Sequence, residues 1–333
     1  MGLGIGIIGA GIMGADHARI IAGQVAGAQL AAIADADLGR ARAVADEIGG
    51  GVATGDAMAI INHAAVDAVL IASPDATHAD YTLACLAAGK PVLCEKPLAP
   101  STEDCLEVVA AEMKVGRRLV QVGFMRRFDP AYGEMRAALD SRDYGRALML
   151  HCAHRNASAP SFFTAAMSIN NSCVHEIDIA RWLLSAELKS VRVVKPKPSS
   201  TAGFEDPLLV IFETDQGQVV DVELYLNCRY GYDIKGELVC ETGTVSLAPP
   251  VNSETRAAGI AAYRFAPDWR PRFATAYRLQ NQAWVDSIHS GRPAGASAWD
   301  GYVASAVAAA GVRALDSGAV EAIHLERKPG FYA

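Results

Sequence analysis

The sequence predicts an α/β protein with an N-terminal domain built on a parallel sheet and a C-terminal α/β domain with a large, mainly antiparallel open sheet. Short apolar runs alternate with helical segments through the first third of the chain, which is typical of parallel strands covered by helices on both faces. Later apolar runs follow one another through short turns, as antiparallel strands do. The length of 333 residues also favours two domains, because one domain usually spans roughly 100–200 residues.

In the first third, each expected strand is a short apolar run that ends at glycine, proline or a polar residue. We expect these strands at residues 3–8, 29–34, 66–72, 91–94 and 119–123. The segments between them predict helices over residues 12–23, 38–48, 80–88 and 102–115. Several of these helices stop at a glycine, as helices often do.

The pattern changes after Gly123, so we expect one domain over residues 1–122 and a second over residues 123–333. Strands are expected at residues 148–152, 190–194, 208–214 and 219–226, with a hairpin formed by 237–240 and 244–247. One helix is expected over residues 174–184, and two more, over 273–289 and 299–316, finish the chain. With no low-complexity linker between them, the two domains are expected to pack together.

Composition excludes several functional classes. The 30 Lys and Arg residues against 37 Asp and Glu give a net charge of −7, whereas binders of nucleic acid or anionic membranes carry surplus positive charge. The seven cysteines form no C-x-x-C pair, so we expect reduced thiols and no metal site. No uncharged apolar run reaches the roughly 18 residues of a membrane span, and the first residues lack the positive region of a signal peptide. A cytoplasmic protein is expected.

A glycine motif follows the first expected strand and opens the first expected helix: Gly9-Ala10-Gly11-Ile12-Met13-Gly14. In this context Gly9 permits the tight turn, Gly11 lets a pyrophosphate approach the backbone, and Gly14 lets the helix pack closely on the strand. The free amides and the positive end of the helix dipole then favour phosphate. The sequence therefore predicts a Rossmann domain that binds a dinucleotide through this turn.

Asp35 ends the second expected strand, about 20 residues beyond the motif, where a carboxylate accepts hydrogen bonds from the adenosine ribose hydroxyls. The same carboxylate would repel a 2′-phosphate, and the first cation after it is Arg40. The expected cofactor is therefore NAD rather than NADP.

Glu95-Lys96-Pro97 follows the expected strand 91–94, at the edge where a doubly wound sheet places groups that contact ligands. Together with the glycine motif, this triplet resembles the glucose–fructose oxidoreductase/inositol dehydrogenase/rhizopine catabolism (Gfo/Idh/MocA) family. The resemblance covers essentially the whole chain and is nearest to the inositol 2-dehydrogenase subgroup. It is also carried by the segments Ser73-Pro74-Asp75-Ala76-Thr77-His78, Gly123-Phe124-Met125-Arg126-Arg127-Phe128-Asp129-Pro130, Arg155-Asn156 and Val174-His175-Glu176-Ile177-Asp178.

The resemblance implies specific roles. Lys96 and His175 match the family's catalytic lysine and histidine. The cofactor would be held, besides the glycine motif and Asp35, by Ser73, Pro74, His78, Glu95, Lys96 and Gln121. The polyol pocket would be lined by Lys96, Met125, Arg126, Asn156, Asn171, Ser172, His175 and Tyr232. The resemblance also implies a homo-oligomer, a tetramer or dimer, that uses the open sheet as an interface, and often a cis peptide at the proline of Glu95-Lys96-Pro97.

One residue departs from the family pattern. The family usually has an aspartate four residues before the histidine, and this chain has Asn171. Asparagine still forms hydrogen bonds, but it adds no negative charge that would raise the basicity of His175. We expect Asn171 to keep a place in the catalytic group with a weaker effect on the histidine.

These residues predict an enzyme that oxidises a secondary alcohol of a cyclic polyol or sugar by hydride transfer to NAD. His175 would remove the hydroxyl proton and Lys96 would stabilise the developing alkoxide. Alternatives within the family are an aldose, scyllo-inositol or anhydrosugar dehydrogenase, and from another class a non-catalytic NAD-binding metabolite sensor. His154 is interpreted as a residue of the pocket wall or the surface.

Overall fold

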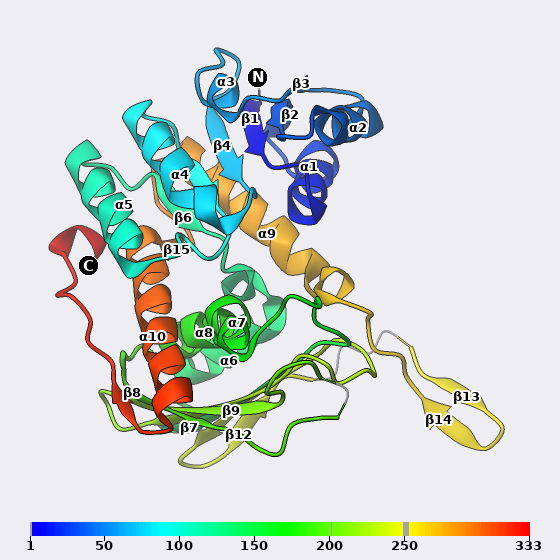
Figure 1. The fold of residues 1–333 in the computed structure, drawn as a ribbon, viewed down its shortest axis with the longest axis vertical. Helices are drawn as coiled ribbons and strands as arrows, with labels where there is room; N and C mark the ends of the chain where they lie inside the picture. Colours follow the sequence, from blue (N-terminus) through cyan, green and yellow to red (C-terminus); the bar gives the residue numbers. More distant parts are fainter. Residues whose placement is uncertain (1, 201, 249–252) are drawn as a thin grey trace. The chain divides into compact units, whose positions relative to one another are not determined.

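The computed structural model describes residues 2–200, 202–248 and 253–333, and its ribbon is drawn in Figure 1. The chain divides into two compact units. The first unit comprises Met1–Phe128, Ala276–Ser305 and Glu326–Ala333, and the second comprises Asp129–Thr275 and Ala306–Leu325. The sequence predicted one boundary at residue 122, whereas the observed units are discontinuous because two late segments return to the first.

The first unit contains a seven-stranded sheet in the order β15-β6-β5-β4-β1-β2-β3. Its strands are β1 (Leu3–Ile8), β2 (Ala28–Ala34), β3 (Val52–Thr54), β4 (Ala68–Ile71), β5 (Val92–Cys94), β6 (Val120–Val122) and β15 (Ala296–Ser297). The strands β1 to β6 pair in parallel, and β15 adds an antiparallel edge to β6. The central strand β4 is buried at every position, as the continuous apolar run predicted. The predicted Rossmann sheet is confirmed.

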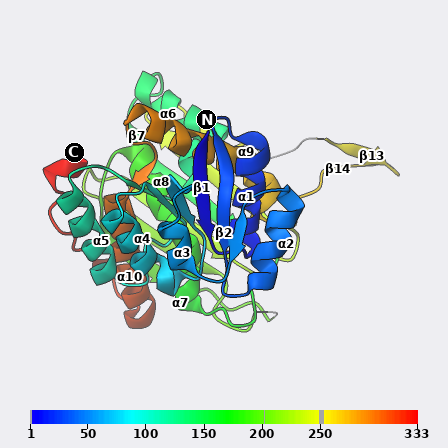
Figure 2. The ribbon, with the colours of Figure 1, turned by 90° about the horizontal axis from the view of Figure 1, so that it is seen from above.

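Helices α1 (Ile12–Gln24), α2 (Leu38–Ile48), α3 (Ala57–Ile61), α4 (His78–Ala87) and α5 (Thr102–Val115) connect these strands. Figure 2 shows β1 and β2 beside α1 and α2. Local sequence explains the helix ends: the Asp37 side chain caps α2, the Ser101 hydroxyl caps α5, and glycines with positive φ end both helices. Short 3₁₀ turns lie at η1 (Asp75–Thr77), η2 (Met125–Phe128) and η4 (Gly330–Tyr332).

The second unit contains a seven-stranded sheet in the order β12-β11-β7-β10-β9-β8-β16. Its strands are β7 (Ala147–Arg155), β8 (Leu188–Val194), β9 (Leu208–Thr214), β10 (Val219–Tyr225), β11 (Asp233–Cys240), β12 (Thr244–Ser246) and β16 (Glu321–Ala322). All neighbours pair antiparallel except β7 and β10, which confirms the mainly antiparallel sheet. Along β10, Val220, Val222 and Leu224 are buried, while Asp221 and Glu223 point to the opposite face.

Helices cover one face of this second sheet, where Figure 1 shows α6 (Pro130–Ser141), α7 (Ala165–Met167) and α8 (Val174–Leu184). A π-helical turn, η3 (Ser168–Cys173), leads directly into α8. A separate hairpin is formed by β13 (Thr255–Ala257) and β14 (Ile260–Ala262). The long helices α9 (Trp269–Ser290) and α10 (Ala298–Ser317) each divide between the two units.

Candidate active site

The first unit has a cavity of about 430 Å³ at the carboxyl ends of β1, β2 and β4. Its walls include Gly9 and Gly11 after β1, Asp35 after β2, and Ser73 and Pro74 after β4. In an open α/β sheet, ligands bind outside the carboxyl ends of the strands. Five of the predicted cofactor residues therefore meet in one cavity at the expected edge of the sheet.

The three glycines of the motif differ in what surrounds them. Gly9 has φ +100°, and a Cβ there would lie 2.4 Å from the Ala72 carbonyl oxygen. A Cβ on Gly14 would lie 1.9 Å from the Gly9 carbonyl oxygen, so helix and turn touch at this point. A Cβ on Gly11, by contrast, would meet nothing within 4 Å, although Gly11 lines the cavity. The open space at Gly11 fits a pyrophosphate, because no side chain caps the amides of α1 beside it.

Asp35 is fixed by two backbone amides. Its carboxylate oxygens accept hydrogen bonds from the Ala10 N–H at 2.8 Å and the Asp37 N–H at 2.9 Å. These bonds hold the carboxylate beside the glycine turn, as recognition of ribose hydroxyls requires. Arg40 also lines this cavity, and its guanidinium lies 3.4 Å from Asp35. The sequence showed Arg40 only as the first cation after Asp35, because its position at the start of a helix does not show where its long side chain turns.

The other predicted cofactor residues lie outside the cavity wall. Ile12 and Met13 form the first turn of α1, where the Ile12 side chain is 60% exposed. His78 and Glu95 are buried and bind neighbouring protein groups. Gln121 lines a different cavity of about 480 Å³, because its side chain leaves β6 toward Gly295. The structure thus does not bring Gln121 to the predicted cofactor cavity.

The Lys96–Pro97 peptide bond is cis, as the family resemblance implied. Two predicted polyol residues follow in this unit, Met125 and Arg126, both in the 3₁₀ turn η2 after β6. Each is 1% exposed. A buried guanidinium is costly unless it is hydrogen-bonded, so the burial of Arg126 indicates a functional or structural need for its charge.

In the second unit, the predicted histidine opens α8. His175 lies in the first turn of the helix and is 9% exposed. Asn171 and Ser172 precede it in the π-helical turn η3. Such turns are frequent at functional sites, because the wider winding changes which side chains share one face. The predicted residues Asn171, Ser172 and His175 are thereby placed on two consecutive turns.

A second histidine stands beside this segment. The His154 Nδ1 atom on β7 lies 3.1 Å from both carboxylate oxygens of Glu176, and both side chains are buried. The His154 ring centre lies 6.3 Å from that of His175 and 6.0 Å from that of Tyr232. His154 is 4% exposed, which rules out the surface alternative. The sequence did not predict its contact with Glu176. Alternation along β7 was the available signal, since it places Cys152 and His154 on the buried face.

Tyr232 and Asn156 complete the predicted set in this unit. Tyr232 is 4% exposed, its backbone N–H donates to the Ala266 carbonyl at 2.7 Å, and its ring packs edge-on against Phe273. The backbone N–H of Asn156 donates to the Tyr225 carbonyl at 3.1 Å, at the end of β7. The second unit therefore supplies imidazole, phenol, amide and hydroxyl groups, which suit hydrogen bonding to a polyol.

In the described part of the chain, no three His, Cys, Asp or Glu side chains gather in a way that could hold a metal ion. Among residues 2–200, 202–248 and 253–333, no helix is long and apolar enough to span a membrane.

Comparison with protein families decides the classification. Residues 3–124 match the model of the Gfo/Idh/MocA oxidoreductase family with an NAD-binding Rossmann fold. Residues 132–246 match the C-terminal domain model of the same family. The chain belongs to the Gfo/Idh/MocA family. This family member is an NAD-dependent oxidoreductase that acts on CH–OH groups.

Curated relatives of this Gfo/Idh/MocA protein extend over its full length. Inositol 2-dehydrogenase 1 of Saccharopolyspora erythraea is 51% identical over 331 residues, which cover 98% of each chain. Inositol 2-dehydrogenase of Streptomyces avermitilis is 47% identical and covers 99% of this chain.

A solved structure of an inositol dehydrogenase is also similar to this chain over its full length. Myo-inositol dehydrogenase from Lactobacillus casei, crystallised with NAD(H) and myo-inositol, superposes with a TM-score of 0.96 at 30% identity over 100% of both chains. The similarity in fold therefore covers the whole chain. The cofactor of the family is NAD.

Proposed function

We propose that this protein oxidises an inositol at a secondary hydroxyl, with NAD as the hydride acceptor. The observation that carries the proposal is the buried cluster of the His154, His175 and Tyr232 rings in a chain that is 51% identical to an inositol 2-dehydrogenase. An inositol presents a hydroxyl on every ring carbon, so its pocket needs many fixed polar partners. A second, acidic or strongly apolar substrate class has no comparable support among these side chains.

The catalytic roles follow from the chemistry of two residues. NAD, when bound, supplies the electrophilic carbon that takes the hydride. His175 removes the hydroxyl proton, because an imidazole has its ordinary pKa near neutrality. Lys96 donates a hydrogen bond to the same oxygen and stabilises the negative charge that develops there.

The remaining predicted residues hold the substrate. Arg126 carries donors only, so it would bind hydroxyl oxygens, while Asn156 and Ser172 can both donate and accept. The Tyr232 ring offers an apolar face with a polar tip, and Met125 supplies an apolar contact. Asn171 replaces the carboxylate of the family pattern, so it would orient a hydroxyl or His175 without adding charge.

The substrate is tested by comparing turnover of myo-inositol, scyllo-inositol, glucose and an anhydrosugar with NAD. We expect kcat/KM to be highest for an inositol, by about tenfold or more, which corresponds to roughly 1.4 kcal/mol in the transition state. A higher kcat/KM for glucose or the anhydrosugar would replace the proposed substrate with that sugar and leave the dehydrogenase assignment intact.

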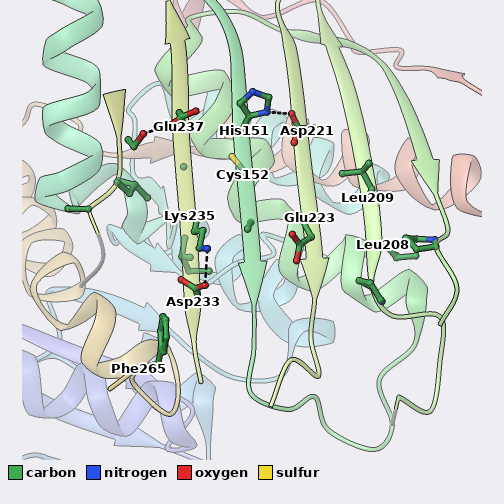
Figure 3. A pocket seen from close by; sticks show the side chains of 18 of the residues that line it. His151, Cys152, Leu208, Leu209, Asp221, Glu223, Asp233, Lys235, Glu237 and Phe265 are labelled. Atoms are coloured by element: carbon green, nitrogen blue, oxygen red, sulfur yellow. Dashed lines mark hydrogen bonds and ion pairs between the residues drawn. The ribbon is translucent and has the colours of Figure 1, made fainter. Parts of the chain in front are cut away.

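We also propose a homo-oligomer, a tetramer or dimer, that uses the sheet face opposite the helices of the second unit. Figure 3 shows this face, with a cavity of about 760 Å³ bordered by Leu209, Asp221 and Phe265. The mixture of apolar and charged groups suits an interface between copies. Light scattering during size-exclusion chromatography would give the mass, and a single-chain mass of 35.1 kDa would contradict the proposal.

The compartment is proposed from cysteine chemistry. All seven cysteines are free thiols and six of them are buried. Free thiols persist in a reducing compartment, which supports the cytoplasm as the place of action.

A further inference from the structure

Lys96 lies between two residues that are each held by a buried histidine of the first unit. His17 is 0% exposed and contacts Glu95, while His78 is 1% exposed and contacts Pro97. The two histidines come from different helices. His17 belongs to α1, which opens at the glycine motif, and His78 is the first residue of α4.

His17 forms a chain of hydrogen bonds through its ring. Its Nε2 atom lies 2.9 Å from the Glu95 Oε1 atom, and its Nδ1 atom lies 3.0 Å from the Asn281 amide nitrogen. The amide nitrogen can only donate and the carboxylate can only accept, so the ring accepts at Nδ1 and donates at Nε2. The other carboxylate oxygen of Glu95 accepts from the Lys96 backbone N–H at 3.3 Å. The Asn281 amide thus fixes the tautomer of His17, and the His17 Nε2–H holds Glu95 against the Lys96 backbone.

His78 faces a carbonyl oxygen at each ring nitrogen. Its Nδ1 atom lies 2.6 Å from the Pro97 oxygen and its Nε2 atom lies 2.9 Å from the Ser73 oxygen. A neutral imidazole donates from one nitrogen only, so both bonds form together only when the ring carries two protons. Burial opposes the charged ring, but the Cys94 sulfur and the two carbonyls outweigh it and raise the pKa of His78 to about 10.

We propose that His17 and His78 are positioning residues that hold Lys96 from both sides and connect it to the two cofactor loops, at the glycine motif and at Ser73–Pro74. His17 links α1 to Glu95, and His78 links the Ser73 carbonyl to the Pro97 carbonyl across a single ring. Neither histidine touches the reacting atoms. Their effect on the reaction rests on the proposed role of Lys96, whereas the hydrogen bonds themselves do not.

The first test is NMR of the histidine ring nitrogens in the full-length wild-type protein, which requires no variant and no substrate. At about pH 8, above the ordinary histidine pKa of about 6.5, we expect two protonated nitrogens in His78 and one, Nε2, in His17. A neutral His78, or a His17 protonated at Nδ1 alone, would overturn the arrangement. This result is independent of whether inositol is the substrate.

The second test measures kcat, KM and thermal stability for two series, His17→Gln and His17→Leu, and His78→Gln and His78→Leu. Glutamine retains a donor and leucine does not, so we expect kcat to fall modestly with Gln and by about 10²-fold with Leu. The KM for the inositol should change less than kcat, because the predicted polyol-binding residues of the second unit are untouched. His289→Gln is the matched control, since His289 is exposed and its Nε2 atom lies 3.5 Å from the Gly27 carbonyl oxygen, far along the chain from Lys96.

The outcomes separate the two proposals. If the wild type is active and the folded leucine variants keep full kcat, the positioning role is overturned. It is also overturned if the Gln and Leu variants lose kcat equally and in proportion to their loss of thermal stability. A wild type without activity on any polyol would instead contradict the proposed function, and the NMR result would still decide the hydrogen bonds of His17 and His78.

Discussion

Gly11 and Gly14 belong to one motif, but the space around their Cα atoms differs. We therefore expect one to serve cofactor binding and the other to serve packing. A Cβ at Gly14 strikes the Gly9 backbone at 1.9 Å, whereas a Cβ at Gly11 enters open space in the cavity. Gly14→Ala should therefore cost about 1–3 kcal/mol of folding stability. Gly11→Ala should fold normally and weaken NAD binding by about tenfold or more, because the methyl group occupies the space of the pyrophosphate.

Thermal unfolding and titration calorimetry with NAD would check this pair of variants. The assignment of the cavity would be contradicted if Gly11→Ala bound NAD as tightly as the wild type.

Asp35 and Arg40 together set the choice between the two nicotinamide cofactors. Asp35 repels a 2′-phosphate, but Arg40 lies 3.4 Å away in the same cavity and is able to pair with one. In Asp35→Ser, the ratio of kcat/KM for NADP to that for NAD should rise by at least about tenfold. Adding Arg40→Leu should remove most of that gain. An unchanged ratio in Asp35→Ser would show that another group selects the cofactor.

At the scale of single elements, α4 carries a pH-dependent contribution to stability through its first residue, His78. The pKa of this histidine is raised from 6.5 to about 10 in the folded protein. The stabilisation is therefore complete below about pH 6.5 and is lost as the pH rises through about 10. The stability difference between wild type and His78→Gln should shrink over that interval.

Melting temperatures of both proteins across that interval measure this difference. A difference that stays constant with pH would mean that His78 does not carry the extra proton.

Elements with a strong period were predictable, and very short ones were not. The helix expected at residues 174–184 is confirmed as α8, because its apolar residues recur at helical spacing. The turn η3 before it was missed, since a π-helical turn has no periodic signal of its own in six residues. The strands β3, β15 and β16 have only two or three residues each, too few to show alternation. Strand β11 starts at Asp233, earlier than expected, because Lys235 and Gly236 interrupt its apolar pattern.

At the scale of the whole molecule, sequence predicted both sheets but not the path of the chain between units. The apolar runs identified each sheet, since burial on two faces or on one gives different patterns. The return of residues 276–305 to the first unit depends on tertiary contacts, including the pairing of Ala296 with Val122, which no local pattern encodes. The residues of the candidate site also fall into a group that the sequence predicted and a group that it did not. Motif residues around Gly9 and Asp35 were predictable, whereas the contacts of Arg40, of His17 and of the His154–Glu176 pair depend on tertiary structure.

In the proposed reaction, hydride passes directly from an inositol carbon to NAD, while His175 removes the hydroxyl proton and Lys96 stabilises the alkoxide. The direct measurement is NADH formation from myo-inositol by the wild type, Lys96→Met, His175→Gln and Asn171→Asp, with NAD binding measured for each. We expect turnover in the wild type, losses of about 10²–10⁴-fold in kcat for the Lys96 and His175 variants at retained NAD affinity, and a gain for Asn171→Asp. A wild type that binds NAD and forms no NADH, or a His175→Gln variant with full kcat, would contradict the account.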